Sequence, residues 1–378
     1  MPERTNGRAT GSRDADPPPR GGAGTRRRVI SGIVSLVLVV GIFAYAIPRI
    51  ADYDEVVTTV AALSPLALWT FLAVTALNLL TYWLATMAAL PGLKLGQAAV
   101  LTQTTTAVSN VVPAGGAVAV GATYTMLRSW GFTGGTIALY VAVTGIWNIF
   151  TKLALPVISI VALAATEGRG GAYVDAALVG VLMLIAAVAV LALVLWKESF
   201  ARQVGDRLGR IASWLRALAR RAPLTDGGDR AEAFRADAVQ LVRRRWLPIT
   251  LTTLLSHLAL YAVLLLALRH VGVSEGEVSA VQVFAVYTFG RLLTALPVTP
   301  GGVGFVELGY IGGLVAVGGN RPRVVAAVFL FRAVTYVLPI PLGALTYVIW
   351  RAKPGWRGDE PPKGSAGESP EEALAGSA

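Results

Sequence analysis

The chain contains no cysteine and only two histidines, His257 and His270, among its 378 residues. The absence of cysteine excludes disulfides, thiolate metal ligands and thiol nucleophiles. Two histidines also argue against a histidine-based metal site. We therefore expect neither a metal ion nor a cofactor.

Charged residues are scarce as well, since they make up 15% of the chain while hydrophobic residues make up 54%. Soluble proteins carry about 25% charged residues. The apolar residues gather in long blocks with few charges, and a block of about 18 residues is typical of a membrane span. These blocks are Leu36–Ile47, Leu66–Leu90, Ala177–Trp196, Leu247–Leu268 and Val324–Trp350. This pattern argues against a soluble enzyme, a nucleic-acid-binding domain and a secreted disulfide scaffold.

The two ends differ from the rest of the chain. Residues 1–28 and 351–378 are rich in proline, glycine and charged or small polar residues, which predicts two disordered tails. Between them, residues 29–350 form the predicted transmembrane domain. The segment 29–47 follows Arg26–Arg28 and ends near Ala44-Tyr45-Ala46, so it imitates a cleavable or twin-arginine signal peptide. At about 19 residues it is long enough to span, and we favour an uncleaved first helix.

The distribution of positive charge predicts the topology. The net charge is +11, and lysine and arginine flank the cytoplasmic ends of membrane spans. Both termini are therefore expected in the cytoplasm of a multi-pass plasma-membrane protein. The linker 197–245 holds twelve lysines and arginines against six acids and is expected there too. Its apolar positions fit either a helix on the anionic inner leaflet or a solvated helix.

Two stretches of the sequence resemble each other. Asn110–Gly116 contains Pro113 and two glycines, and Pro297–Gly304 repeats this pattern about 185 residues later. The preceding spans run in opposite directions, so repeat one (about 66–166) and repeat two (about 247–350) would be inverted, as in many transporters. Chance recurrence is the alternative in a chain with 41 glycines and 20 prolines.

Proline and glycine within these stretches predict interrupted helices. We expect two re-entrant hairpins, with limbs 97–112 and 117–128 entering from inside and limbs 278–297 and 305–318 from outside. The long helix 134–166 is expected to break near Pro156. The predicted fold is an all-α polytopic membrane protein with six full spans and two re-entrant hairpins. If every limb crosses the membrane, the count rises to ten.

Ionisable residues inside apolar segments are the main functional candidates, because each costs on the order of 3 kcal/mol to insert. Glu307 is expected to pair with Arg291 and Arg332, which leaves one positive charge for an anionic substrate. A purely structural ion pair is the alternative, and Lys152 and Arg128 could play the same part in repeat one. The helix N-termini after the glycines would also suit an anion. The substrate-binding candidates are Glu307, Arg332, Arg291, Gly301, Gly302, Tyr336, Gly115, Gly116, Lys152 and Arg128.

No arrangement of residues indicates catalysis. The sequence has no pair of carboxylates on one face of an apolar helix, and neighbouring Ser256 and His257 do not form a catalytic geometry. The glycines at 21–24 lack the strand context of a nucleotide-binding loop. We therefore expect no enzymatic activity.

The stretch Leu296–Glu307, with the sequence LPVTPGGVGFVE, and the following span with Arg332 and Tyr336 resemble the lysylphosphatidylglycerol synthase transmembrane family. This family is also called flippase-like, after the membrane half of the multiple peptide resistance factor. Its upstream motif is similar to the segment 112–128, but the glutamate common there is replaced by Val118, Ala119 and Val120. The resemblance covers about residues 29–350 and implies an integral inner-membrane protein related to phospholipid translocases. Since the chain ends about 28 residues after the last span, we expect no soluble synthase domain.

Three functions fit these observations. The first is translocation of a phospholipid or polyprenyl-type anionic lipid across a bacterial plasma membrane. The second is transport of a small anionic solute. The third is a non-transporting partner of an envelope glycosyltransferase, with the linker 197–245 as its docking surface, and a homo-oligomer is compatible with all three. None of them involves nucleic acid.

Overall fold

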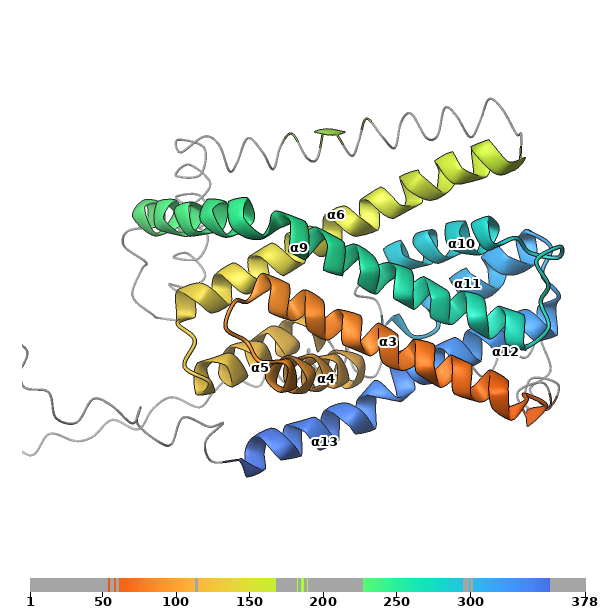
Figure 1. Ribbon diagram of the computed structural model, residues 1–378, viewed down its shortest axis with the longest axis horizontal. Coiled ribbons are helices and arrows are strands. Elements are labelled where there is room, and N and C mark those ends of the chain that lie inside the picture. Colours follow the sequence, from red (N-terminus) through yellow and green to blue (C-terminus); the bar gives the residue numbers. More distant parts are fainter. Residues whose placement is uncertain are drawn as a thin grey trace, which may run out of the picture.

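The computed structural model describes residues 61–112, 115–167, 227–294 and 302–353, with the single positions 54, 58, 182, 185, 186, 189 and 299. Every regular element in these ranges is helical (Figure 1). Four of the helices are long and apolar enough to cross a membrane: Pro65–Ala89, Gly134–Thr166, Phe234–His270 and Arg321–Ala352. The described part of the chain is thus all-helical, as expected of a polytopic membrane protein. The other two expected spans, 29–47 and 174–196, both tails and most of the linker lie outside the described residues, apart from single positions.

The helices form two groups with the same order of lengths: one long, two short, one long. The first group is α3 (Pro65–Ala89), α4 (Leu95–Val111), α5 (Gly115–Ser129) and α6 (Gly134–Glu167). The second is α9 (Gly227–His270), α10 (Ala280–Leu293), α11 (Phe305–Ala316) and a last helix. That last helix consists of α12 (Arg321–Arg332), the π-helical turn η3 (Ala333–Val337) and α13 (Pro339–Ala352). Interruptions are present where they were expected, because α4 ends at Val111 and α5 begins at Gly115, while α10 ends at Leu293 and α11 begins at Phe305.

Capping residues place several helix starts. The Ser64 hydroxyl accepts a hydrogen bond from the Ala67 amide at 3.1 Å, and Pro65 occupies the first turn of α3. Ser279 and Gln282 form a reciprocal capping box at α10. Both arrangements satisfy amides that have no partner within the helix. The starts of these two helices are therefore encoded locally.

Two long helices differ from their expected form. Helix α6 continues through Pro156 and does not break there. Proline removes one backbone hydrogen bond, and neighbouring helices can support such a position inside a membrane protein. Here the Ser159 hydroxyl donates to the Pro156 carbonyl at 2.8 Å and lies 3.0 Å from the Thr288 hydroxyl of α10. Helix α9 likewise begins at Gly227 and passes through Pro248, so the expected boundary between linker and span is continuous helix.

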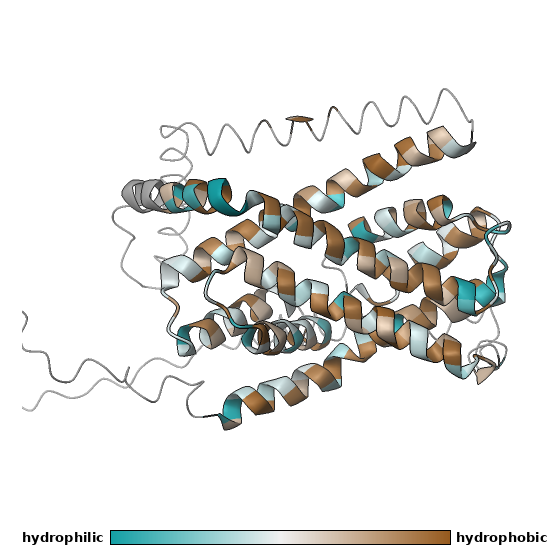
Figure 2. Cartoon of the chain, viewed as in Figure 1, coloured by the Kyte–Doolittle hydropathy of each residue, from teal (hydrophilic) through white to brown (hydrophobic). Residues whose placement is uncertain are grey.

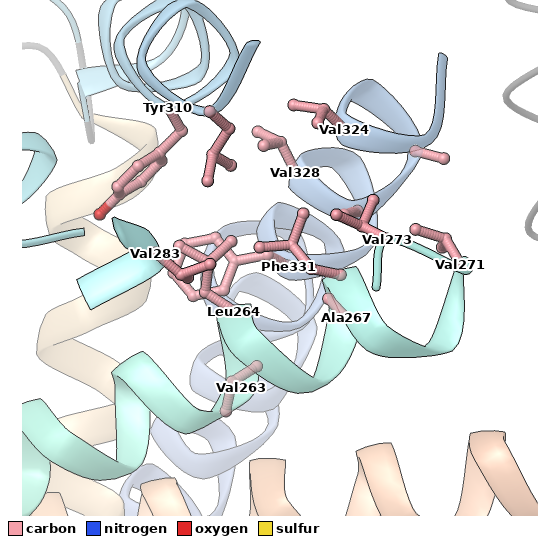
Figure 3. Close-up of a cluster of buried hydrophobic side chains, with 14 of the residues drawn as sticks. Val263, Leu264, Ala267, Val271, Val273, Val283, Tyr310, Val324, Val328 and Phe331 are labelled. Carbon is pink, nitrogen blue, oxygen red and sulfur yellow. The ribbon is translucent and has the colours of Figure 1, made fainter. Parts of the chain in front are cut away.

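The two groups pack against each other through reciprocal pairs of helices. Helix α3 packs along α9, its counterpart in the second group, while α4 packs against α13 and α10 packs against α6. The largest apolar core joins α9, α10, α11 and α12 and includes Leu264, Val283, Tyr310 and Phe331 (Figure 3). The groups therefore form one bundle.

The short helices lie toward opposite ends of this bundle. Figure 1 shows α4 and α5 at the end where α3 finishes, and α10 and α11 at the end where α9 finishes. Figure 2 shows hydrophilic residues gathered at these two ends, on the coloured turns that follow the grey start of α9 and on the loop after α9, with an apolar zone between them. This distribution suits a lipid bilayer around the middle of the bundle.

The contact between α4 and α13 depends on a glycine. A Cβ atom on Gly343 would overlap the Ala107 side chain and the Gln103 carbonyl oxygen. Close by, the Thr104 and Thr346 hydroxyls are 3.0 Å apart. Small residues allow such close helix contacts in membranes.

We predict that Gly343→Leu lowers the free energy of unfolding by about 2 kcal/mol, because the larger side chain forces the two helices apart. Unfolding in detergent micelles, followed by circular dichroism, measures this change. Gly121→Leu is the matched control, since a Cβ atom on Gly121 of α5 meets open space. Equal stability of the two variants would contradict the prediction.

Candidate functional site

A glycine-dependent turn positions Glu307 at the start of α11. Gly302 and Gly304 have φ angles of +70° and +89°, in the left-handed region that other residues rarely adopt. The Gly304 amide donates to Glu307 Oε2 at 2.7 Å, which is the backbone half of a capping box. The carboxylate therefore lies at the positive end of the helix dipole, where a negative charge is stabilised.

The same carboxylate forms a buried ion pair. Glu307 Oε1 lies 2.6 Å from Arg332 Nε, and the two side chains are 3% and 12% exposed. Burying an ionised carboxylate is costly unless it is paired and hydrogen-bonded, and here each oxygen has a donor. The pair joins α11 to the end of α12.

A π-helical turn places an aromatic ring beside Arg332. Leu338 donates its amide to the Ala333 carbonyl at 2.8 Å, five residues back. Pro339 follows and has no amide hydrogen to donate. Within this turn, the Tyr336 ring centroid lies 4.6 Å from Arg332 Cζ, a cation–π distance. Such turns are frequent at functional sites.

Tyr336 also links the last helix to the interruption in the first group. Its hydroxyl donates to the Asn110 carbonyl at 2.9 Å, and the Asn110 side-chain amide donates to the Tyr336 carbonyl at 3.1 Å. Asn110 lies at the end of α4, next to the Pro113 interruption. The end of α4 and the start of α11 therefore both contact the last helix, at Tyr336 and at Arg332.

A cavity of about 320 Å³ lies at this meeting point. Its wall includes Arg332 and Tyr336 of the last helix, Arg291 of α10 and Tyr310 of α11. Polar residues of α3 and α4 complete it: Asn78, Tyr82, Thr102, Gln103, Thr105, Thr106 and Asn110. No aspartate or glutamate lines the cavity within the described ranges.

Arg291 is the second cation of the cavity wall. Its Nε atom is buried and has no hydrogen-bond partner among the residues that the structure describes. Sequence reasoning expected Arg291 to share Glu307 with Arg332. The structure pairs Glu307 with Arg332 and places Arg291 on the cavity wall, with Lys152 and His257 within electrostatic reach.

The candidates from the first group do not line the cavity. Gly115 is buried against the Ser109 backbone, which a Cβ atom would overlap, while Gly116 is exposed. Arg128 is exposed and donates to the carbonyl of Phe132 at 3.2 Å, so its side chain contacts the loop that follows α5. Lys152 is half-buried on α6. The first group therefore contributes neutral polar residues to this cavity, and the role expected for Lys152 and Arg128 in repeat one stays a prediction. Gly301 lies outside the described residues.

Two cavity residues on α3, Asn78 and Tyr82, were not among the sequence candidates. They are four residues apart on an apolar span and so share one helix face. Asn78 donates its side-chain amide to the Ser256 carbonyl of α9 at 3.2 Å. Their spacing of four residues could have indicated a polar face. Isolated polar residues in spans, however, commonly hold helices together, so the spacing alone does not indicate a binding site.

We predict that Glu307→Gln lowers the free energy of unfolding by about 3 kcal/mol, because it leaves Arg332 buried without its counter-charge. Arg332→Gln should cost a similar amount. The double variant should lose less than the sum of the two by at least about 1 kcal/mol, since the residues are in contact. Denaturation in detergent micelles measures all three variants.

Glu275→Gln provides the control, because this exposed carboxylate also pairs with an arginine, Arg269, and also accepts from a backbone amide, that of Ala280. The free energy of unfolding of Glu275→Gln should fall by less than about 1 kcal/mol. Additive effects of Glu307→Gln and Arg332→Gln would contradict the energetic coupling.

No curated protein matches the chain. The family model described as the lysylphosphatidylglycerol synthase TM region matches residues 32–343. The matched range contains the turn at Gly302 and Gly304 and the Glu307–Arg332 pair. It also covers more than four fifths of the 378 residues, so the chain belongs to the lysylphosphatidylglycerol synthase transmembrane family.

Proposed function

We propose that this protein moves an anionic lipid across a bacterial plasma membrane, with the lipid head group passing through the cavity at Arg291 and Arg332. The supporting observation is that Arg291 lines the cavity and that its buried Nε atom has no hydrogen-bond partner among the described residues. The proposed activity is transport and not catalysis. Family membership is compatible with it, because the matched region is the membrane part of the family.

The charge balance of the cavity favours an anion. Glu307 neutralises Arg332, whereas no acidic residue of the described wall compensates Arg291. An uncompensated guanidinium within an apolar bundle is costly, and a phosphate would supply the missing charge and strong hydrogen bonds. The head group would thus bind where the protein alone leaves a positive charge.

We further propose that α4–α5 and α10–α11 are re-entrant hairpins of two inverted repeats. These helices have 17, 15, 14 and 12 residues, and at about 1.5 Å per residue none reaches the roughly 30 Å of a bilayer core. Their positions toward opposite ends of the bundle and the reciprocal helix pairs support an inverted arrangement. Both termini would then lie in the cytoplasm.

Transport of a small soluble anion is the second candidate, because a cavity of about 320 Å³ with a polar wall could hold such a solute. The two candidates differ in whether acyl chains accompany the charged group. A flux measurement with both kinds of substrate separates them.

We predict that proteoliposomes containing the full chain move tail-labelled phosphatidylglycerol between leaflets, as measured by quenching of the outer leaflet. Arg291→Gln should slow this movement by roughly tenfold or more, since a charge-assisted hydrogen bond to phosphate contributes about 1.5–3 kcal/mol. Uptake of radioactive phosphate into the same vesicles tests the alternative, transport of a small soluble anion.

Arg351→Gln is the matched control, because Arg351 is exposed at the end of α13, away from the cavity wall. It should leave the rate unchanged. Movement of phosphate without movement of lipid would overturn lipid translocation in favour of the solute transporter. Equal rates for Arg291→Gln and the unaltered protein would remove Arg291 from the mechanism.

A further inference from the structure

The uncharged part of the cavity wall indicates which anionic head groups it binds. We infer that the cavity selects a phosphorylated polyol or sugar head group, and discriminates against head groups that carry an ammonium. The inference rests on the proposed function for the lipid part of the substrate. It adds the chemical class of the head group, which the two arginines alone do not define.

The first argument is the lack of a partner for an ammonium. No acidic residue lines the cavity within the described ranges, and by sequence residues 113–114 and 295–301 contain none either. The nearby Glu307 carboxylate already accepts from Gly304 on one oxygen and from Arg332 on the other. An ammonium would therefore be desolvated beside two guanidinium groups without a counter-charge.

The second argument is the supply of groups that both donate and accept hydrogen bonds. Gln103 is 6% exposed and lines the cavity, and its side-chain amide makes no hydrogen bond to any described residue. The same holds for the hydroxyl of Thr106, one helical turn later on the same face of α4. An amide and a hydroxyl each offer donors and acceptors, which matches the hydroxyls of a polyol.

Two more threonines extend this wall. The hydroxyls of Thr102 and Thr105 donate to the carbonyls of Ala98 and Leu101 at 2.7 and 2.8 Å. Their donors are used, but their oxygen lone pairs remain able to accept from a ligand hydroxyl. Helix α4 thus lines the cavity with neutral hydrogen-bonding groups, whereas α10 and α12 contribute its two arginines.

The aromatic residues of the wall do not reverse this preference. A tyrosine face can attract an ammonium, but Arg332 already lies 4.6 Å from the Tyr336 ring centroid. Tyr82 and Tyr310 stand within electrostatic reach of Arg291. The cavity volume, about 320 Å³, is at the lower limit of small-molecule pockets and suits a head group without its acyl chains.

The test compares three tail-labelled lipids in proteoliposomes: phosphatidylinositol, phosphatidic acid and phosphatidylethanolamine. Binding of their short-chain forms to the detergent-solubilised full chain is measured in parallel. We expect phosphatidylinositol to exceed phosphatidic acid by about fivefold, because each added hydrogen bond contributes about 1 kcal/mol, and to exceed phosphatidylethanolamine by more than tenfold. The double variant Gln103→Leu/Thr106→Val should abolish the preference for phosphatidylinositol over phosphatidic acid.

Thr125→Val is the matched control, because this threonine is exposed on α5 and donates to the Gly121 carbonyl. It should keep the full preference. Equal handling of phosphatidylinositol and phosphatidylethanolamine, or an equal loss for all three lipids in the double variant, would overturn the inference. Selective binding without movement of any lipid would overturn translocation alone and uphold the assignment of the head group.

Discussion

The burial of one carboxylate, that of Glu307, constrains three parts of this bundle at once. Each oxygen of the buried Glu307 carboxylate has a donor, because Gly304 supplies an amide at 2.7 Å and Arg332 a guanidinium at 2.6 Å. The first requires the left-handed turn before α11, and the second requires α12 to end beside it. The turn, the start of α11 and the end of α12 are therefore fixed together, and the cavity forms where they meet the end of α4.

Interrupted helices are compatible with a membrane bundle because other groups satisfy their backbone. The π-helical turn redirects the last helix, and Asn110 and Tyr336 exchange two hydrogen bonds across the bundle. Irregular backbone at membrane depth is tolerated where protein or a water-filled cavity surrounds it. The proposed binding site thus coincides with the places where helical hydrogen bonding is incomplete.

Much of this architecture could be predicted from the sequence. Long apolar runs gave the spans at α3, α6, α9 and the last helix, and proline–glycine pairs gave the interruptions. The rule that buried charges pair brought Glu307 and Arg332 together. The course of α6 through Pro156 could not be predicted, because the sequence does not reveal that α10 packs beside this part of the helix. The position of Gln103, Asn78 and Tyr82 on the cavity wall could not be predicted either. A lone polar residue on a span has the same sequence pattern whether it faces a helix or a cavity.

The central claim is that two oppositely oriented groups of helices meet at one cationic cavity. Labelling of single cysteines with a membrane-impermeant maleimide tests it directly, because the chain has no cysteine of its own. Lys94 and Arg128 flank α4–α5, Ser274 and Arg321 flank α10–α11, and all four are exposed. The account predicts that cysteines at 274 and 321 are labelled in intact cells, and that those at 94 and 128 are labelled only after permeabilisation. Labelling of both pairs from the same side would contradict it.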